Sequence, residues 1–217
     1  MSSRILPRFR SKIWLLLAVM FYPPPVYADT LCSYQSFTWD TRARQSVNRV
    51  RIVKPYAELS AEEIDSYTGC SVCEQDQRSI RIVPLAPFKV CRLLAPRLER
   101  ELRRLLREGM PIDEIVGYRV GRTRGDVDTA GLRTRFSNHS FGVAIDINPD
   151  HNGLYDNCLT FSPECRLIRG GHWDPARPES LRADGDIVNA MESIGLEWGG
   201  EIEGWQKDFM HFSPSGY

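Results

Sequence analysis

The sequence predicts an α+β domain with a largely antiparallel sheet and flanking helices. Two segments, 96–108 and 186–194, have the apolar spacing of amphipathic helices, and short stretches of alternating apolar and polar residues lie around them. The connections between these stretches are short. With 217 residues of ordinary composition, the chain fits one domain with a small additional portion.

Residues 29–92 are expected to form short strands and loops. Valine and isoleucine alternate with arginine at 50–53 and again at 80–83, and each stretch is closed by a proline. Between them, Ser60-Ala-Glu-Glu63 has the pattern of a capping box, which predicts the start of a short helix.

The first amphipathic helix is predicted to begin at Pro96 and to end before Gly109. Its leucines recur at helical spacing: Leu98, Leu102, Leu105 and Leu106. The second helix is predicted over Asp186–Ile194, with Gly195 ending it. Trp198 then leads into a final strand region around His211.

Four residues of the last third of the chain have the chemistry of a catalytic metal site: His139, Asp146, Asp208 and His211. Two imidazoles and one carboxylate can hold zinc while a further position stays open for water. Asp208 and His211 are three residues apart, so one can bind the metal while the other reaches that water. We assign His211 as a ligand and Asp208 as the acid/base group.

The segment 142–147 predicts the local position of Asp146. Small or polar residues alternate there with branched apolar ones, which is typical of a half-buried strand. Val143, Ile145 and Ile147 are expected to share one face. Gly142 and Ala144 would then share the other face with Asp146, where their small size leaves room for a metal.

This part of the chain resembles the D-alanyl-D-alanine carboxypeptidase family of zinc peptidases, which includes phage L-alanyl-D-glutamate endolysins. The resemblance is carried by Ser137-x-His139-x-x-Gly142-x-Ala144-x-Asp146, Gly195-Leu-Glu-Trp-Gly-Gly200 and Asp208-x-x-His211-Phe212. It implies the Hedgehog/DD-peptidase fold and one zinc ion per chain. His139, Asp146 and His211 would bind the zinc, and Asp208 would be the catalytic base.

The resemblance also covers Gly117-Tyr118-Arg119, which matches a tripeptide of the family. It implies that Arg119 contacts the substrate and supports the oxyanion, a role that suits a fixed guanidinium. Ser137 is expected to hydrogen-bond the substrate.

The similarity runs from about Glu114 to the end of the sequence. We therefore predict a catalytic domain at 93–217 and a disulfide-containing portion at 29–92 packed on it. The chain departs from the family in a long segment between Asp146 and Trp198 that carries Cys158 and Cys165. An insertion beside the cleft can narrow the choice of substrate.

Residues 1–28 have the pattern of an export signal. Four basic residues precede the apolar run 13–21, and a Val-Tyr-Ala sequence ends at Ala28, where we expect cleavage. The alternative is an uncleaved anchor, although the run is shorter than the about 20 residues that span a bilayer. Either reading places the catalytic part outside the cytoplasm, periplasmic or secreted, and after cleavage we expect no stable membrane insertion.

Charge and cysteine content agree with export. Removing residues 1–28 leaves 24 basic and 28 acidic residues, a balance of −4 that gives no global attraction to nucleic acid. The even number of cysteines, six, favours disulfides. Cys158–Cys165 is the pair we predict, and a zinc site at Cys70-x-x-Cys73 is the competing reading for that motif.

The arginines that precede His139 have two readings, a solvated loop or a site that captures a peptide carboxylate. They are Arg122, Arg124, Arg133 and Arg135. His151 and His172 are expected to be structural.

The function favoured by the sequence is zinc-dependent hydrolysis of peptidoglycan stem peptides, either at a terminal D-alanine or at an L-alanyl-D-amino acid bond. One alternative is a zinc-containing module of the same fold that binds peptidoglycan without turnover. Another is a non-haem iron oxygenase, which also uses two histidines and a carboxylate. In oxygenases the first histidine and the carboxylate commonly lie two residues apart, whereas His139 and Asp146 lie seven apart.

Overall fold

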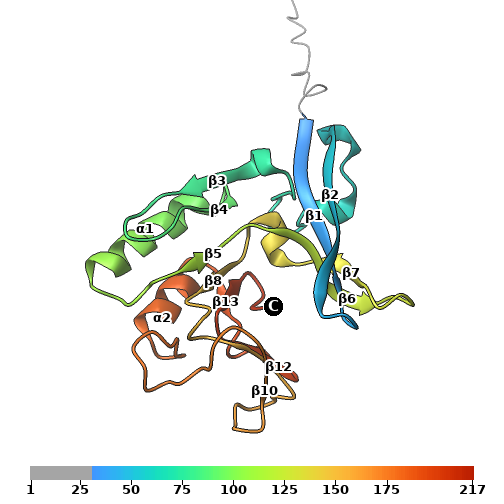
Figure 1. Cartoon of the computed structure of the whole chain (residues 1–217). Coiled ribbons are helices and arrows are strands. Elements are labelled where there is room, and N and C mark those ends of the chain that lie inside the picture. Colours follow the sequence, from blue (N-terminus) through green and yellow to red (C-terminus); the bar gives the residue numbers. More distant parts are fainter. Residues whose placement is uncertain (1–30) are drawn as a thin grey trace, which may run out of the picture.

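The computed structural model of the chain describes residues 31–217 (Figure 1). The predicted signal sequence at 1–28 lies outside this range. The described part combines two α-helices with short strands in four sheets, and all but one of the strand pairings are antiparallel. None of its helices is long and apolar enough to cross a membrane.

One sheet is built from the beginning and the middle of the chain. Its order is β2 (Gln45–Pro55), β1 (Leu31–Asp40), β6 (Val120–Val127) and β7 (Arg133–Phe136). The β1–β6 pair is parallel and the other two pairs are antiparallel. The disulfide-containing portion is therefore joined to the following half of the chain by backbone hydrogen bonds.

The other sheets are small. One has the order β11 (Glu197–Trp198), β13 (His211–Ser213), β8 (Ile145–Ile147) and β5 (Ile115–Val116). A second has the order β10 (Arg166–Arg169), β9 (Leu154–Asp156) and β12 (Gln206–Asp208), and β3 (Gln77–Ile80) pairs with β4 (Phe88–Cys91).

Both predicted helices are confirmed, as α1 (Ala95–Arg107) and α2 (Asp186–Ser193). Pro96 lies in the first turn of α1, and Gly195 follows α2 with a φ of +81°. Four 3₁₀ helices complete the described elements: η1 (Tyr56–Glu58), η2 (Ala61–Glu63), η3 (Glu74–Asp76) and η4 (Asn138–Phe141). The predicted capping box opens η2.

Two apolar clusters hold these elements together. The larger one joins the leucines of α1 and the inward face of α2 to Ile145, Ile147 and Phe212 of the sheet around β8 and β13. The smaller one joins Phe141 and Val143 to Tyr34, Val120 and the cysteines near the start of the chain. The chain around Asp146 therefore takes part in both clusters: Val143 packs in the smaller one, and Ile145 and Ile147 pack in the larger one.

The predicted α+β class is confirmed, with strands divided among four sheets instead of one central sheet. The Hedgehog/DD-peptidase fold and the division at residue 93 stay predictions. The predicted strand 142–147 is correct only for Ile145–Ile147. Gly142 instead ends η4 with a φ of +67°, because the chain turns sharply there between His139 and Asp146.

The structure contains three disulfides: Cys32–Cys73, Cys70–Cys91 and Cys158–Cys165. The predicted Cys158–Cys165 pair is confirmed. The competing zinc site at Cys70-x-x-Cys73 is wrong, because each sulfur is bonded to a different cysteine. Disulfides persist in oxidising surroundings, which agrees with a place outside the cytoplasm.

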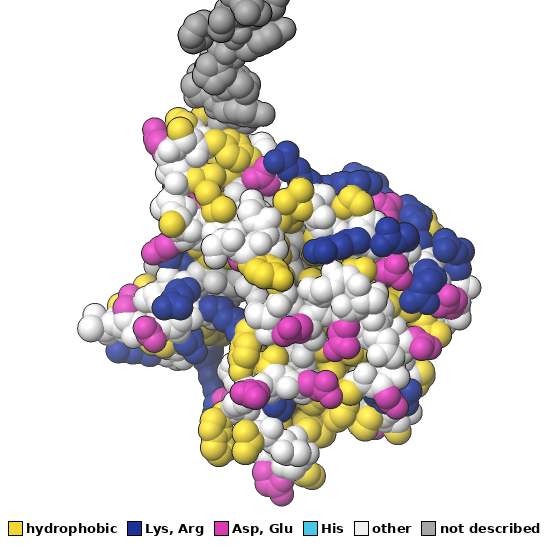
Figure 2. Space-filling view, turned by 180° about the vertical axis from the view of Figure 1, so that it is seen from behind, with side chains coloured by type: hydrophobic (Ala, Val, Ile, Leu, Met, Phe, Trp, Pro, Cys, Tyr) yellow, Lys and Arg dark blue, Asp and Glu magenta, His cyan; other side chains and the backbone are white. Residues whose placement is uncertain are grey.

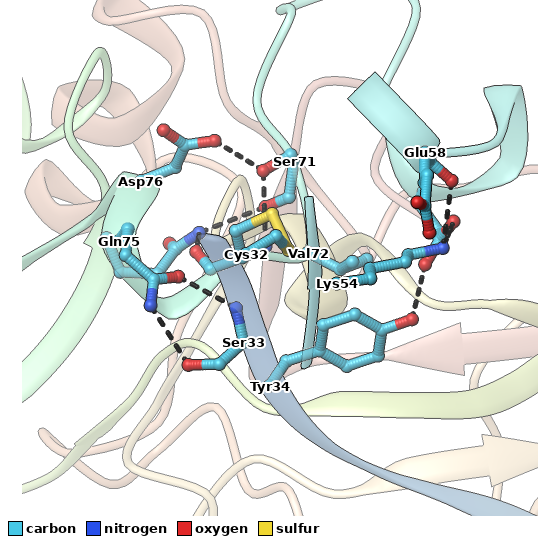
Figure 3. Close-up of a disulfide and its surroundings, with 12 residues drawn as sticks. Cys32, Ser33, Tyr34, Lys54, Glu58, Ser71, Val72, Gln75 and Asp76 are labelled. Atoms are coloured by element: carbon cyan, nitrogen blue, oxygen red, sulfur yellow. Dashed lines mark hydrogen bonds and ion pairs between the residues drawn. A yellow bond between two sulfur atoms is a disulfide. The ribbon is translucent and has the colours of Figure 1, made fainter. Parts of the chain in front are cut away.

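A buried carboxylate lies beside the Cys32 disulfide. Tyr34 and Lys54 both donate to Glu63, and Lys54 also donates to the Glu58 carbonyl (Figure 3). The Ser60 backbone N–H donates to Glu63 at 2.8 Å. Burial alone would raise the pKa of Glu63, but the hydrogen bonds from Lys54, Tyr34 and Ser60 outweigh it and lower the pKa from 4.5 to about 2.

We expect Glu63→Gln to lower the free energy of unfolding at pH 7 by about 3 kcal/mol. The reason is that a carboxyl whose pKa is lower in the folded than in the unfolded chain stabilises the folded chain when it is ionised. This contribution is complete above the unfolded-state pKa and is lost as the pH falls from about 4.5 toward 2. Urea denaturation at pH 7 and pH 3 measures it. The control is Glu62→Gln, which removes an exposed partner of Arg122. A Glu63→Gln effect that is equal at both pH values contradicts this account.

Candidate metal centre

The pairing of β8 with β13 brings two of the four predicted site residues together. His211 and Asp146 are direct partners across these antiparallel strands, although 65 residues separate them in the chain. His139 comes from η4, which packs against the same place from outside the sheet. All three side chains are almost fully buried.

The donor atoms of these three residues form a nearly regular triangle. His139 Nε2 and His211 Nδ1 each lie 3.0 Å from Asp146 Oδ1, and the two nitrogens lie 3.2 Å apart. Ligand atoms of a tetrahedral zinc ion, at about 2.1 Å from the metal, lie about 3.4 Å from one another. The three donors therefore fit one zinc ion, and they are the only group of this kind within residues 31–217.

The Gly117 carbonyl lies 2.9 Å from Nδ1 of His139, and Arg119 Nη1 lies 2.9 Å from the same atom. The carbonyl only accepts, so it favours the tautomer with the proton on Nδ1 and the lone pair of Nε2 directed at Asp146 and His211, whereas the guanidinium N–H only donates and favours the reverse. Burial lowers the pKa of His139 to about 4, against the attraction of Asp146. A neutral imidazole of this kind is the form that binds a metal.

Asp146 is ionised in these surroundings. Burial would raise the pKa of its carboxyl, but His139, His211 and Arg119 hold that pKa well below its usual range. Arg119 Nη2 donates to Asp146 Oδ2 at 3.0 Å, which leaves Oδ1 for the two histidines. Arg119 thus fixes the orientation of the carboxylate that is predicted to bind the metal.

Two polar atoms near the triangle are buried and have no hydrogen-bond partner in the described structure: His211 Nε2 and Asp208 Oδ1. Buried polar atoms usually have partners, so such orphans mark a place where a ligand or a reacting group belongs. Burial raises the pKa of Asp208 to about 6, with the charge of His211 opposing the rise. A carboxylate with such a pKa is suited to taking and returning a proton near neutral pH.

The Gly-Tyr-Arg tripeptide has a distinct structural task at each position. A Cβ on Gly117 would lie 2.2 Å from the Lys89 carbonyl of β4, so only glycine permits this approach. Tyr118 donates from its hydroxyl to the Val72 carbonyl at 2.6 Å. With these two residues anchored, Arg119 is directed at His139 and Asp146.

The glycines near Trp198 position Asp208 in the same manner. A Cβ on Gly199 would lie 2.5 Å from the Asp208 carbonyl, and the Asp208 N–H donates to the Gly199 carbonyl at 2.9 Å. Trp198 Nε1 donates to the Phe209 carbonyl at 2.8 Å. The Gly195–Gly200 motif therefore holds the strand end that carries Asp208.

Ser137 and the four arginines occupy different surroundings. Ser137 is buried directly before η4, and within the described range its hydroxyl has no hydrogen-bond partner. Arg122 pairs with Glu62, and Arg133 donates to the Gly125 carbonyl, so these two are structural. Arg124 is half-buried, and Asp208 and Asp146 are the acidic groups whose charges act on it most strongly. His172 is exposed and outside the triangle.

The sequence reasoning missed the Gly117 carbonyl as the partner of His139 and did not single out Arg124 among its neighbours. The Gly117-Tyr118-Arg119 motif is the signal that could have pointed to the Gly117 carbonyl. Nothing in the sequence distinguishes Arg124, because its position depends on two irregularities in the pairing of β6 with β7.

A family model described as D-alanyl-D-alanine carboxypeptidase matches residues 130–214. This segment contains His139, Asp146, Asp208 and His211, and it excludes Arg119. The match confirms the resemblance to this family of zinc peptidases, and it supports metallopeptidase chemistry in general. Searches of curated proteins and of solved structures found no match.

We expect the chain to bind one zinc ion and to gain thermal stability from it, by about 2.7 kcal/mol when free zinc is 100 times the dissociation constant. His139→Ala and His211→Ala should lose both the bound zinc and the thermal shift. His172→Ala, an exposed histidine, is the matched control and should keep both. Metal analysis after dialysis and thermal unfolding with buffered zinc provide the measurements. A thermal shift that survives His139→Ala contradicts the assignment.

Proposed function

We propose that this chain is a zinc peptidase that hydrolyses peptidoglycan stem peptides, as a D-alanyl-D-alanine carboxypeptidase or an L-alanyl-D-amino acid endopeptidase. The observation that carries the proposal is the convergence of His139 Nε2, Asp146 Oδ1 and His211 Nδ1 within 3.2 Å, inside a segment that matches a peptidase family. The Hedgehog/DD-peptidase fold and an exported location belong to the same proposal.

His139, Asp146 and His211 hold the zinc. When bound, zinc acts as a Lewis acid that lowers the pKa of water from 15.7 to about 7 and polarises the scissile carbonyl. The Gly117 carbonyl and the Arg119 guanidinium keep the imidazole of His139 and the carboxylate of Asp146 in their binding orientations.

Asp208 performs the proton transfers in this mechanism. Its Oδ1 atom accepts a proton from the attacking water and returns it to the nitrogen of the leaving amine. This oxygen is buried and has no hydrogen-bond partner within the described residues, so no other donor competes for it. The raised pKa of Asp208 makes the carboxyl a competent acid for the second step.

Arg119 and Ser137 complete the proposed site. Arg119 supports negative charge that develops on the scissile carbonyl oxygen, and Ser137 hydrogen-bonds the substrate. Arg124 is suited to a peptide carboxylate, because its half-buried guanidinium has no ion-pair partner among residues 31–217. Figure 2 shows Arg and Lys side chains along a hollow beside the lobe that carries β6 and β7. Their positive charge favours an anionic substrate.

The two alternatives from the sequence differ in what they require. A binding module needs the metal but not the proton acceptor, whereas Asp208 is present and enclosed. An iron oxygenase would contain stoichiometric iron and depend on oxygen, so metal analysis distinguishes it.

We expect Asp208→Asn to keep stoichiometric zinc and to reduce cleavage of purified muropeptides by about 10²- to 10⁴-fold, the usual contribution of a positioned acid/base group. Mass spectrometry of the products, with and without a zinc chelator, measures this and identifies the bond. Loss of one terminal alanine indicates a carboxypeptidase, and an internal cut indicates an endopeptidase.

The matched control is Asp174→Asn, which changes an exposed loop aspartate. Cleavage by Asp208→Asn at the unaltered rate would remove Asp208 from its role. Tight muropeptide binding by the zinc-loaded chain without any product would favour the binding module.

A further inference from the structure

A cavity of about 390 Å³ lies next to the candidate metal centre, outside the segment that matches the peptidase family. Its wall is formed by β1, β2, η3 and the chain that leads into β6. The side chains that matter for its chemistry are Phe37, Arg49, Arg51, Glu74 and Arg119. Apart from Arg119, these residues all precede Glu114, where the family resemblance begins, so the resemblance assigns them no role.

The side chain of Phe37 lines the cavity, and a glycine makes room for its ring. A Cβ on Gly121 would lie 2.4 Å from the Phe37 ring, so the ring rests directly on the backbone of β6. Gly121 is also the partner of Phe37 across the parallel β1–β6 pair. This close approach fixes an aromatic surface beside the place where Arg119 leaves the sheet.

The cavity carries excess positive charge. Arg49 and Arg51 of β2 both reach side chains of the neighbouring β1. Arg49 lies over the Phe37 ring, 5.6 Å from its centroid, and Arg51 donates to the Ser33 hydroxyl at 3.4 Å. Neither has an ion-pair partner within residues 31–217, and both are exposed. Glu74 supplies the one acidic side chain of the wall.

Arg119 connects the cavity to the metal centre. It lines the cavity, while its guanidinium donates to Asp146 Oδ2 at 3.0 Å. One side chain therefore separates the cavity from the metal-binding carboxylate. An extended peptide advances about 3.5 Å per residue, so a substrate held at the metal centre reaches the cavity within a few residues of the scissile bond.

We propose that this cavity is a substrate subsite that binds a carboxylate of the peptide through Arg49 and Arg51. The inference rests on the proposed function and deepens it, because it defines the substrate as a peptide with an acidic group near the scissile bond. Two guanidinium groups with no ion-pair partner among residues 31–217 suit a planar carboxylate, and the Phe37 ring supports its aliphatic stem. Glu74 can accept an N–H of the same peptide.

The β1–β2 hairpin would accordingly contribute to recognition, although the metal ligands all come from later in the chain. A neutral amide in place of the carboxylate would lose its charge-assisted hydrogen bonds with the two arginines. The cavity therefore distinguishes an acidic peptide from its amidated counterpart.

The test compares two synthetic peptides, L-alanyl-γ-D-glutamyl-L-lysyl-D-alanine with a free α-carboxylate on the glutamate, and the same peptide with that group amidated. Titration calorimetry on the zinc-loaded Asp208→Asn chain, in which cleavage is suppressed, measures binding of each, and the further variants are made in this chain. We expect the acid to bind at least about tenfold more tightly than the amide, as for other charge-assisted hydrogen bonds. The double variant R49Q/R51Q should lose this preference and keep its affinity for the amide.

The control is Arg107→Gln, an exposed arginine at the end of α1 with the same change in charge. It should keep the preference of the Asp208→Asn chain. Equal affinity of the Asp208→Asn chain for acid and amide, a preference that survives in R49Q/R51Q, or absence of binding by both peptides overturns the proposal. Cleavage is measured separately, with Asp208 restored and purified muropeptides as substrate, so a preference for the acid without any cleavage there would disprove the peptidase and leave the subsite intact.

Discussion

The antiparallel pairing of β8 with β13 is the constraint on which the site depends. It places Asp146 opposite His211 and leaves their donor atoms 3.0 Å apart. Because Ile145, Ile147 and Phe212 on these strands are fully buried, the pairing cannot shift register without exposing core side chains. The core therefore keeps a buried carboxylate and a buried imidazole together, an arrangement that a metal ion compensates.

The disulfide-containing portion supports this arrangement from outside the sheet. The backbone of β4 approaches Gly117 through Lys89 and Gly142 through Cys91, where the Cys91 N–H donates to the Gly142 carbonyl at 2.8 Å. Gly117 then supplies the carbonyl that orients His139, and Gly142 ends the 3₁₀ helix that carries it. The Cys70–Cys91 disulfide ties β4 to the segment 70–73, and Cys32–Cys73 ties that segment to β1. Orientation of the predicted metal ligands and the stability of this portion are thus coupled.

The sequence predicted those features that are local. The leucine spacing of 98–106, the capping box at Ser60 and the Cys158–Cys165 loop all depend on neighbouring residues, and each is confirmed. The assembly of His139, Asp146 and His211 was accessible only because the motif as a whole resembles a known family. Periodicity failed at 142–144, where the left-handed turn at Gly142 overrides the alternating pattern.

Long-range features were beyond sequence reasoning. The parallel pairing of β1 with β6 joins residues more than 80 positions apart, and no pattern in either strand specifies its partner. The pairs Cys32–Cys73 and Cys70–Cys91 likewise join residues 41 and 21 positions apart, and cysteine spacing does not specify them. The position of Arg49 and Arg51 beside Arg119 has the same origin.

X-ray absorption at the zinc edge of the zinc-loaded chain tests the central claim most directly, because it reports the ligands of the metal independently of any substrate. The account predicts a first shell of nitrogen and oxygen at about 2.0–2.2 Å with the scattering of two imidazoles and no sulfur. A first shell containing sulfur at about 2.3 Å, or one with the scattering of fewer than two imidazoles, would contradict it.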